Sequence, residues 1–166
     1  MDPDKKAFTV MEMVIVILVV TILAVVIVPR IAALYPIRLS GAAEKLASDL
    51  RYTQNLAMSK HIKHRIVFDV NAQQYAVECY KIDIGWEAVE DPLGRGSNLS
   101  VDYTSDSRYQ GIKIDSAEFP PPLGSDSVEF DSTLGKPSSK GEVVLSCSDA
   151  SYKVKVTANT GRVSIE

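Results

Sequence analysis

The chain has 166 residues, 46% of them hydrophobic, a size and composition that suit one globular domain with its own core. Its formal net charge is −3, so the chain as a whole lacks the positive field that binds nucleic acid, and a nucleic-acid partner is not expected. The two cysteines, Cys79 and Cys147, form no Cys-x-x-Cys pair and have no ligand-like spacing to a histidine. We therefore predict no metal and no cofactor.

Residues 1–7 are polar and too short to fold, and we interpret them as a cleavable leader. Lys5 and Lys6 favour a cytoplasmic location for this end of the chain. Arg30 and Arg38, however, flank the far end of the segment that follows. Charge alone therefore leaves the orientation open.

An apolar run occupies residues 8–28, with Glu12 as its only charge. As a helix it would be about 31 Å long, which matches a hydrocarbon layer of ~30 Å. It is longer than the apolar region of a secretory signal and lacks the small-residue cut site, so we predict a retained transmembrane helix. Pro29 and Pro36 each lack a backbone donor, and we expect a helix break at Pro29 and a kink or melted turn between the two prolines.

Residues 29–61 are predicted to form an amphipathic stalk helix. From about Leu39 to Lys60, small or apolar residues recur every three or four positions, as on one buried face of a helix. This stripe consists of Leu39, Ala43, Leu46, Leu50, Thr53 and Ala57, and the other side carries Glu44, Lys45, Ser48, Asp49 and Arg51.

After Lys60 the apolar period changes to two, so we expect residues 62–166 to form a β-rich globular domain. The clearest hairpin joins the last two predicted strands, because the turn between them contains Asn159 and Gly161. Between Gly85 and Gly141 we expect long loops with two short strands at most, at 112–114 and 128–130. The other strands are predicted at 66–68, 75–80, 143–146, 152–156 and 163–165.

The string from Lys5 to Met13, followed by the apolar run, resembles the processing site of type IV pilins and of the pseudopilins of type II secretion. The resemblance implies that prepilin peptidase cuts between Ala7 and Phe8 and that the new amino group of Phe8 is methylated. Glu12 would then be the fifth mature residue, and Pro29 falls where these proteins often carry a helix-breaking proline. The implied α+β fold is pilin-like, with a long N-terminal helix packed on a C-terminal antiparallel sheet domain.

The segment 41–57, the strand 65–69 and the turn 160–163 resemble the minor pseudopilin H group and its pilin relatives. This implies a minor pseudopilin, a structural subunit of the type II secretion pseudopilus. The alternative is a minor type IV pilin in pilus assembly or DNA uptake. The implied partners are other pseudopilins or pilins, met through the N-terminal helix, and prepilin peptidase. The implied location is the bacterial inner membrane, crossed once, with the C-terminal domain in the periplasm and no small-molecule substrate.

Glu12 is the candidate assembly residue. A charged residue near the centre of a spanning helix costs roughly 2.5–3.5 kcal/mol on insertion scales, and less towards the ends. In the family picture the ammonium of Phe8 on a neighbouring subunit neutralises the carboxylate, and such a pair fixes the register. The alternatives are that Glu12 reaches the head-group layer or is protonated.

The residues around the end of the stalk form a basic cluster that could contact phosphate, lipid head groups or an acidic partner. The alternative, which we favour, is that these cations complement the dipole at a helix C-terminus. His61 and His64 have the spacing of a metal pair but no accompanying ligand motif. The cluster comprises Lys60, His61, Lys63, His64 and Arg65.

Three further features leave the function class unchanged. Cys79 and Cys147 each end a predicted strand, and they either pair as a disulfide in an oxidising periplasm or remain buried thiols. The segment from Asp126 to Asp131 is rich in oxygen ligands, but its spacing departs from a calcium loop and we expect a solvated turn. No catalytic signature is present, so we do not expect an enzyme.

Two readings from other classes stay open. A DNA receptor would use basic residues near the C-terminus, but Arg162 stands alone there and Glu166 closes the chain. A plain single-pass anchored domain would keep its N-terminus intact in the mature protein.

Overall fold

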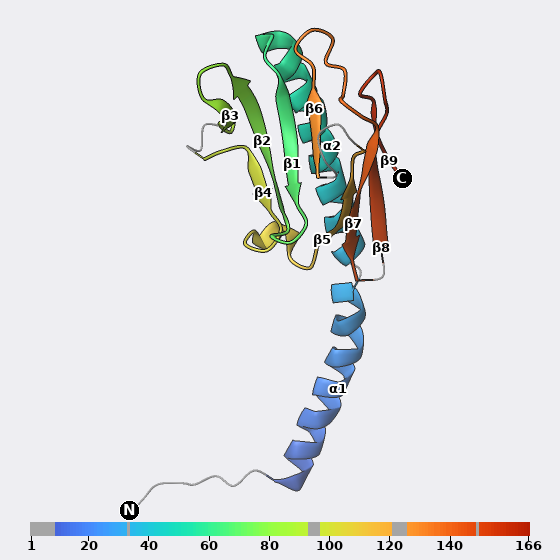
Figure 1. Ribbon diagram of the computed structural model, residues 1–166. Coiled ribbons are helices and arrows are strands. Elements are labelled where there is room, and N and C mark those ends of the chain that lie inside the picture. The colour runs from blue at the N-terminus through green and yellow to red at the C-terminus, as the bar shows by residue number, and fades with distance from the viewer. Residues whose placement is uncertain (1–8, 33, 93–96, 121–125, 149) are drawn as a thin grey trace, which may run out of the picture. The chain divides into compact units, whose positions relative to one another are not determined.

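The computed structural model describes residues 9–32, 34–92, 97–120, 126–148 and 150–166 (Figure 1). Within the first helix and the start of the second, side chains are described up to Val25 and again from Tyr35. The chain divides into two compact units, Met1–Tyr35 and Pro36–Glu166. All described buried residues lie in the second unit, which therefore carries the described core.

The first unit contains helix α1, Val10–Ala32. Thr9 begins this helix, because its carbonyl accepts the amide of Met13 and its hydroxyl accepts the amide of Glu12, both at 3.2 Å. Every described side chain from Val10 to Val25 is exposed in the single chain. In the part of the chain that the structure describes, no helix combines the length and the hydropathy that crossing a membrane requires.

The predicted interruption at Pro29 lies at the end of this unit. Helix α1 includes Pro29 and ends at Ala32, and the next helix begins at Leu34. A proline removes one hydrogen bond, so helical residues can follow it for part of a turn. Residue 33 lies outside the described residues, and the break at Pro29 stays a prediction.

The second unit begins with helix α2, Leu34–Lys60, whose apolar stripe is confirmed. All six residues of the predicted stripe are fully buried. The pattern assigns Asp49 to the polar side of the helix. This prediction is wrong, because Asp49 is buried and only 5% exposed. Helix α2 runs behind the strands of both sheets and shares one core with them (Figure 1).

The first sheet has five antiparallel strands in the order β3-β2-β1-β6, and β4 also pairs with β2. Strand β1 pairs with β2 from His64 opposite Cys79 to Asp69 opposite Gln74. The strands are β1 His64–Asp69, β2 Gln74–Lys81, β3 Gly85–Ala88, β4 Ser100–Asp102 and β6 Ser127–Phe130.

The second sheet has four antiparallel strands in the order β5-β7-β8-β9. The hairpin predicted at the C-terminus is confirmed, and its turn places Asn159 and Gly161 at φ 69° and 66°, where Asn and Gly are the favoured residues. The strands are β5 Lys113–Glu118, β7 Gly141–Cys147, β8 Ala150–Val156 and β9 Val163–Ile165.

The two sheets are joined at the turn between β1 and β2. The side-chain amide of Gln73 accepts the backbone N–H of Ile114 on β5 at 2.7 Å and donates to the carbonyl of Ile114 at 3.0 Å. Phe68 on β1 stacks on Phe119, just after β5, with ring centroids 5.8 Å apart. Backbone and core contacts therefore link residues far apart in the sequence.

The described part of segment 85–141 contains four strands, more than the two that were expected, which correspond to β5 and β6. Besides β3, β4, β5 and β6 it contains a 3-10 helix, η1, Ser107–Tyr109. The four strands are three to six residues long, and β4 has Val101 as its single buried residue. Such strands carry too few residues for an alternating pattern, and pairing with neighbours defines them instead.

Candidate functional site

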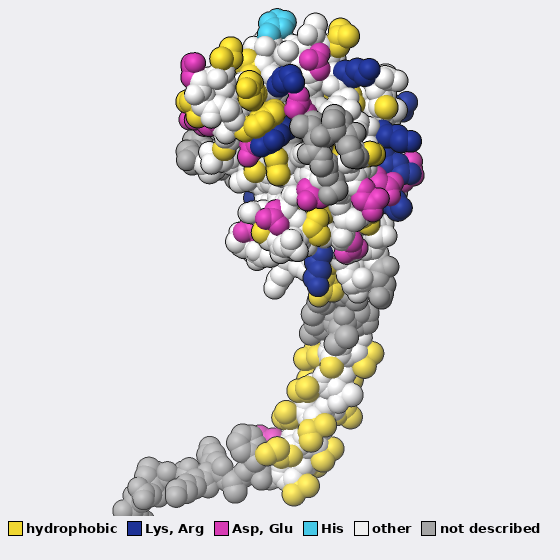
Figure 2. All heavy atoms as spheres, viewed as in Figure 1, with side chains coloured by type: hydrophobic (Ala, Val, Ile, Leu, Met, Phe, Trp, Pro, Cys, Tyr) yellow, Lys and Arg dark blue, Asp and Glu magenta, His cyan; other side chains and the backbone are white. Residues whose placement is uncertain are grey.

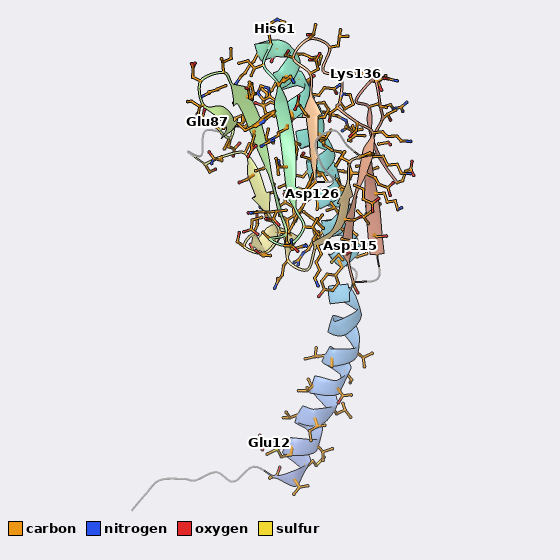
Figure 3. The ribbon with its side chains drawn as sticks, viewed as in Figure 1. Glu12, His61, Glu87, Asp115, Asp126 and Lys136 are labelled. Carbon is orange, nitrogen blue, oxygen red and sulfur yellow. The ribbon has the colours of Figure 1, made fainter. Side chains whose placement is uncertain are left out.

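Glu12 lies in the first turn of α1 among apolar side chains (Figure 3). The helix dipole favours a carboxylate at this end. Val10 and Met11 beside it are 82% and 73% exposed, and Met13 is 55% exposed. Among the residues that the structure describes, no salt bridge involves Glu12. The arrangement presents one carboxylate on an otherwise apolar surface.

The predicted cleavage and methylation site, Ala7 and Phe8, lies outside the described residues. Cleavage between the two residues and methylation of Phe8 therefore stay predictions. The described helix begins two residues later, at Val10.

Two cations of the basic cluster have carboxylate partners. Lys63 pairs with Glu129 at 2.7 Å, and this hydrogen bond raises the pKa of Lys63. Arg65 pairs with Glu78 at 2.7 Å and lies over the ring of Trp86 at 4.1 Å. Carboxylates thus already neutralise two of these cations, and the phosphate interpretation loses its support.

The two histidines of the cluster lie in different environments. His61 is exposed, with φ 52°, just after the end of α2. His64 is buried on β1, with its Nδ1 2.7 Å from the carbonyl oxygen of Ile62, and burial lowers its pKa. Among the described residues no three His, Cys, Asp or Glu side chains form a group that could hold a metal.

The segment from Asp126 to Asp131 is not the expected solvated turn. Residues 127–130 form β6, with Val128 and Phe130 fully buried. The carboxylate of Asp131 accepts the amide of Thr133 at 3.2 Å, and hydrogen bonds of this kind lower its pKa. The oxygens counted as ligands belong to β6 and to the residues on either side of it.

The cysteines lie in different sheets. Cys79 is half-buried on β2, and Cys147 is buried at the end of β7. Both are free thiols in the structure, and because Cys79 is only half-buried, the choice between a disulfide and two buried thiols stays a prediction.

A buried polar network around Asp49 escaped the sequence pattern. The hydroxyl of Tyr75 donates to the carboxylate at 2.7 Å, and Lys45 forms an ion pair with it at 2.5 Å. Burial, with smaller contributions from nearby Tyr103 and Asp49, raises the pKa of Tyr75 well above its usual value. The Lys45–Asp49 spacing of four was the available signal, because it places both side chains on one helix face. The network fixes α2 on the first sheet.

The solved structures include proteins of similar fold. No protein-family model matches the chain, and the comparison with curated proteins gives no match. The minor pseudopilin EpsH from the type 2 secretion system of Vibrio cholerae is similar with a TM-score of 0.59 and 12% identity, over 78% of this chain and 96% of that chain. The type IV minor pilin FimU of Pseudomonas aeruginosa is similar with a TM-score of 0.51 and 16% identity, over 77% of this chain and 87% of that chain.

These likenesses confirm the predicted fold class. The helix of the second unit packs on antiparallel sheets, as the resemblance implied. The chain therefore has an α+β fold like that of these two solved proteins.

Proposed function

We propose that the chain is a minor pseudopilin, a structural subunit of the type II secretion pseudopilus. Residues 8–28 anchor it in the bacterial inner membrane, and the second unit functions in the periplasm. One observation carries the proposal: Glu12 is the single charge among the exposed apolar side chains that open α1, on a chain with a pilin-like fold.

The surface of α1 supports an assembly role. Its large apolar side chains between Val10 and Val25 are 47% to 82% exposed in the single chain. A helix that is apolar on all sides is buried, either in lipid or among other helices. Lipid covers this helix before assembly, and neighbouring subunits cover it within the filament.

Glu12 then has a specific task. In apolar surroundings a carboxylate is costly unless a positive group pairs with it. Cleavage after Ala7 by prepilin peptidase would create an ammonium on Phe8, and the Phe8 of an adjacent subunit would supply the partner. The pair sets the register between subunits.

Mass spectrometry of the N-terminal peptide of the native protein tests the proposal. We expect a chain that begins at a methylated Phe8. A native chain that still begins with Met1 or Asp2 would have no amine at this position, and the proposal would then fail in favour of a plain anchored domain.

A minor type IV pilin is the second candidate, because FimU is also similar in fold. Gene neighbourhood separates the two: secretion genes beside this gene support the first, and pilus-assembly genes support the second. A role in DNA uptake would need DNA binding by the second unit that weakens with salt. The ion pairs of Lys63 and Arg65 argue against such binding.

A further inference from the structure

Apolar side chains surround the turn between β2 and β3, where polar residues are the norm. Ile82 is 92% exposed, Ile84 is 70% exposed and Tyr80 is 42% exposed. Trp86 on β3 is half-buried. We call Tyr80, Ile82, Ile84 and Trp86 the tip patch.

The strand register places the two aromatic members of the patch on one face. Tyr80 lies directly opposite Trp86, and their rings meet edge-on with centroids 5.4 Å apart. Tyr75 and Val77 on the same strand are buried, so the even-numbered positions of β2 face away from the core. Figure 2 shows hydrophobic side chains gathered over the β2–β3 side of the second unit, among Lys, Arg, Asp and Glu side chains.

The cations beside the tip patch are neutralised within the chain. Arg65 pairs with Glu78, Lys81 pairs with Glu87 and Lys63 pairs with Glu129. The patch combines aromatic and aliphatic side chains, Arg65 lies over the ring of Trp86, and the exposed Asp83 lies between the two isoleucines. Aromatic residues and arginine are enriched in the cores of protein interfaces. Among the described residues these three cations already have carboxylate partners, which disfavours phosphate or an anionic lipid surface, so the fitting partner is a largely apolar protein surface.

The patch lies at one end of the second unit. The amide of Tyr80 donates to the carbonyl of Lys63 at 2.9 Å, three residues after α2 ends at Lys60. Pro36, where the chain enters this unit, lies near the other end of α2. The patch is thus at the end remote from the entry of the chain.

The size of the patch indicates a weak contact. Aromatic side chains bury roughly 150–250 Å² each, so four partly exposed side chains supply a few hundred Å². A stable complex buries about 800 Å² on each partner. Such a patch cannot hold two free copies together, but it can act when a shared assembly already keeps the partners close.

We propose that the tip patch docks the globular domain of the next subunit in the same filament. This inference rests on the proposed function and adds the contact surface and its chemistry. The contact is weak in solution and becomes effective once the N-terminal helices have assembled.

The test uses the second unit, residues 36–166, which contains the whole described core. Isotope-labelled protein is titrated with the globular domains of the other pilin-like proteins of the same cell, each purified without its apolar helix. We expect one of them to shift the amide signals of residues 80–86. The double substitution Ile82→Asp and Ile84→Asp should weaken this binding at least about tenfold.

Leu134→Asp is the matched control, because Leu134 is an equally apolar side chain, 75% exposed, in a different loop. It should leave the binding unchanged. The inference is overturned if no domain shifts residues 80–86, if the unit binds only itself through them, or if anionic vesicles bind there. If the native chain begins at a methylated Phe8, any of these results contradicts this inference but leaves the proposed function standing. If the native chain still begins at Met1, the proposed function itself is wrong.

Discussion

Glu12 is the residue on which assembly depends in our proposal. Glu12→Gln keeps the size and polarity of the side chain but removes the charge that would pair with an ammonium. Losing a buried ion pair costs about 3–5 kcal/mol, so incorporation into sheared filaments should fall about a hundredfold or more. Immunoblots of filament and membrane fractions measure this, and we expect the amount in the membrane fraction to be unchanged.

Thr21→Val is the control for Glu12→Gln. Thr21 is also polar and lies on α1, but its hydroxyl donates to the carbonyl of Ile17 at 2.7 Å within the helix. It therefore needs no partner from another subunit, and incorporation should stay normal. Normal incorporation of the Glu12→Gln chain would contradict the role of the charge.

Tyr75 makes a testable contribution to the buried network. Tyr75→Phe removes the hydrogen bond to Asp49, and a hydrogen bond to a charged group contributes about 1.5–3 kcal/mol. Urea unfolding of residues 36–166 should show a loss of that size. In Tyr103→Phe the loss should be much smaller, because the buried hydroxyl of Tyr103 has no hydrogen-bond partner among the described residues. Equal losses in both variants would rule out the network as the cause.

The turn between β8 and β9 depends on α2. Gln54 donates to the carbonyls of Gly135 and Thr160, both at 2.9 Å. A Cβ on Gly161 would clash with the Nε2 atom of Gln54. Gly161 also has φ +66°. Gly161→Ala should therefore lower the free energy of unfolding by about 1–2 kcal/mol or more.

Gly41→Ala provides the opposite case on α2. A Cβ there meets nothing within 4 Å, and replacing a helical glycine by alanine gains roughly 0.5–1 kcal/mol. Urea unfolding of the two variants should thus shift in opposite directions. A stabilised Gly161→Ala chain would show that the turn is not held as described.

Periodicity predicted the elements that are long and buried on one face. It located α2 and its stripe, and strands β1, β2, β7, β8 and β9. It missed β3 and β4, because four and three residues cannot display an alternating pattern. It placed Asp49 on the exposed side because charged side chains usually face solvent. The hydroxyl of Tyr75, which donates to the Asp49 carboxylate, is distant in the sequence and so gave no local signal.

The candidate site was predictable only where a local motif exists. Glu12 stands out because one charge in an apolar run is visible without a structure. The tip patch was not predicted, although Ile82 and Ile84 flank Asp83 in a turn. The patch is recognisable only from the strand register, which brings Trp86 beside Tyr80, and from the ion pairs of the nearby cations.

For the second unit as a whole, we predict that His64 makes folding sensitive to acid. Burial lowers its pKa in the folded state below the unfolded value of about 6.5, so the folded state favours the neutral ring. Its contribution is fully present above the unfolded pKa and is lost as the pH falls from there through the folded pKa. Urea midpoints of residues 36–166 should therefore decrease from pH 7.5 to lower pH.

Comparison of two variants isolates this effect. His64→Leu should flatten the pH dependence, because the ring that resists protonation is gone. His61→Leu should keep it, because His61 is exposed. An unchanged slope in His64→Leu would assign the acid sensitivity to other groups.

The side-chain contact that joins the sheets also covers part of a strand edge. Gln73 occupies both backbone groups of Ile114 on the edge strand β5, Arg51 donates to Val163 on β9, and Ser138 covers Glu129 on β6. Open strand edges are templates for uncontrolled pairing between molecules. In the filament that we propose, subunits at high local density could then collide without forming mixed sheets through β5, β6 or β9, and association would be left to the contacts that build the filament.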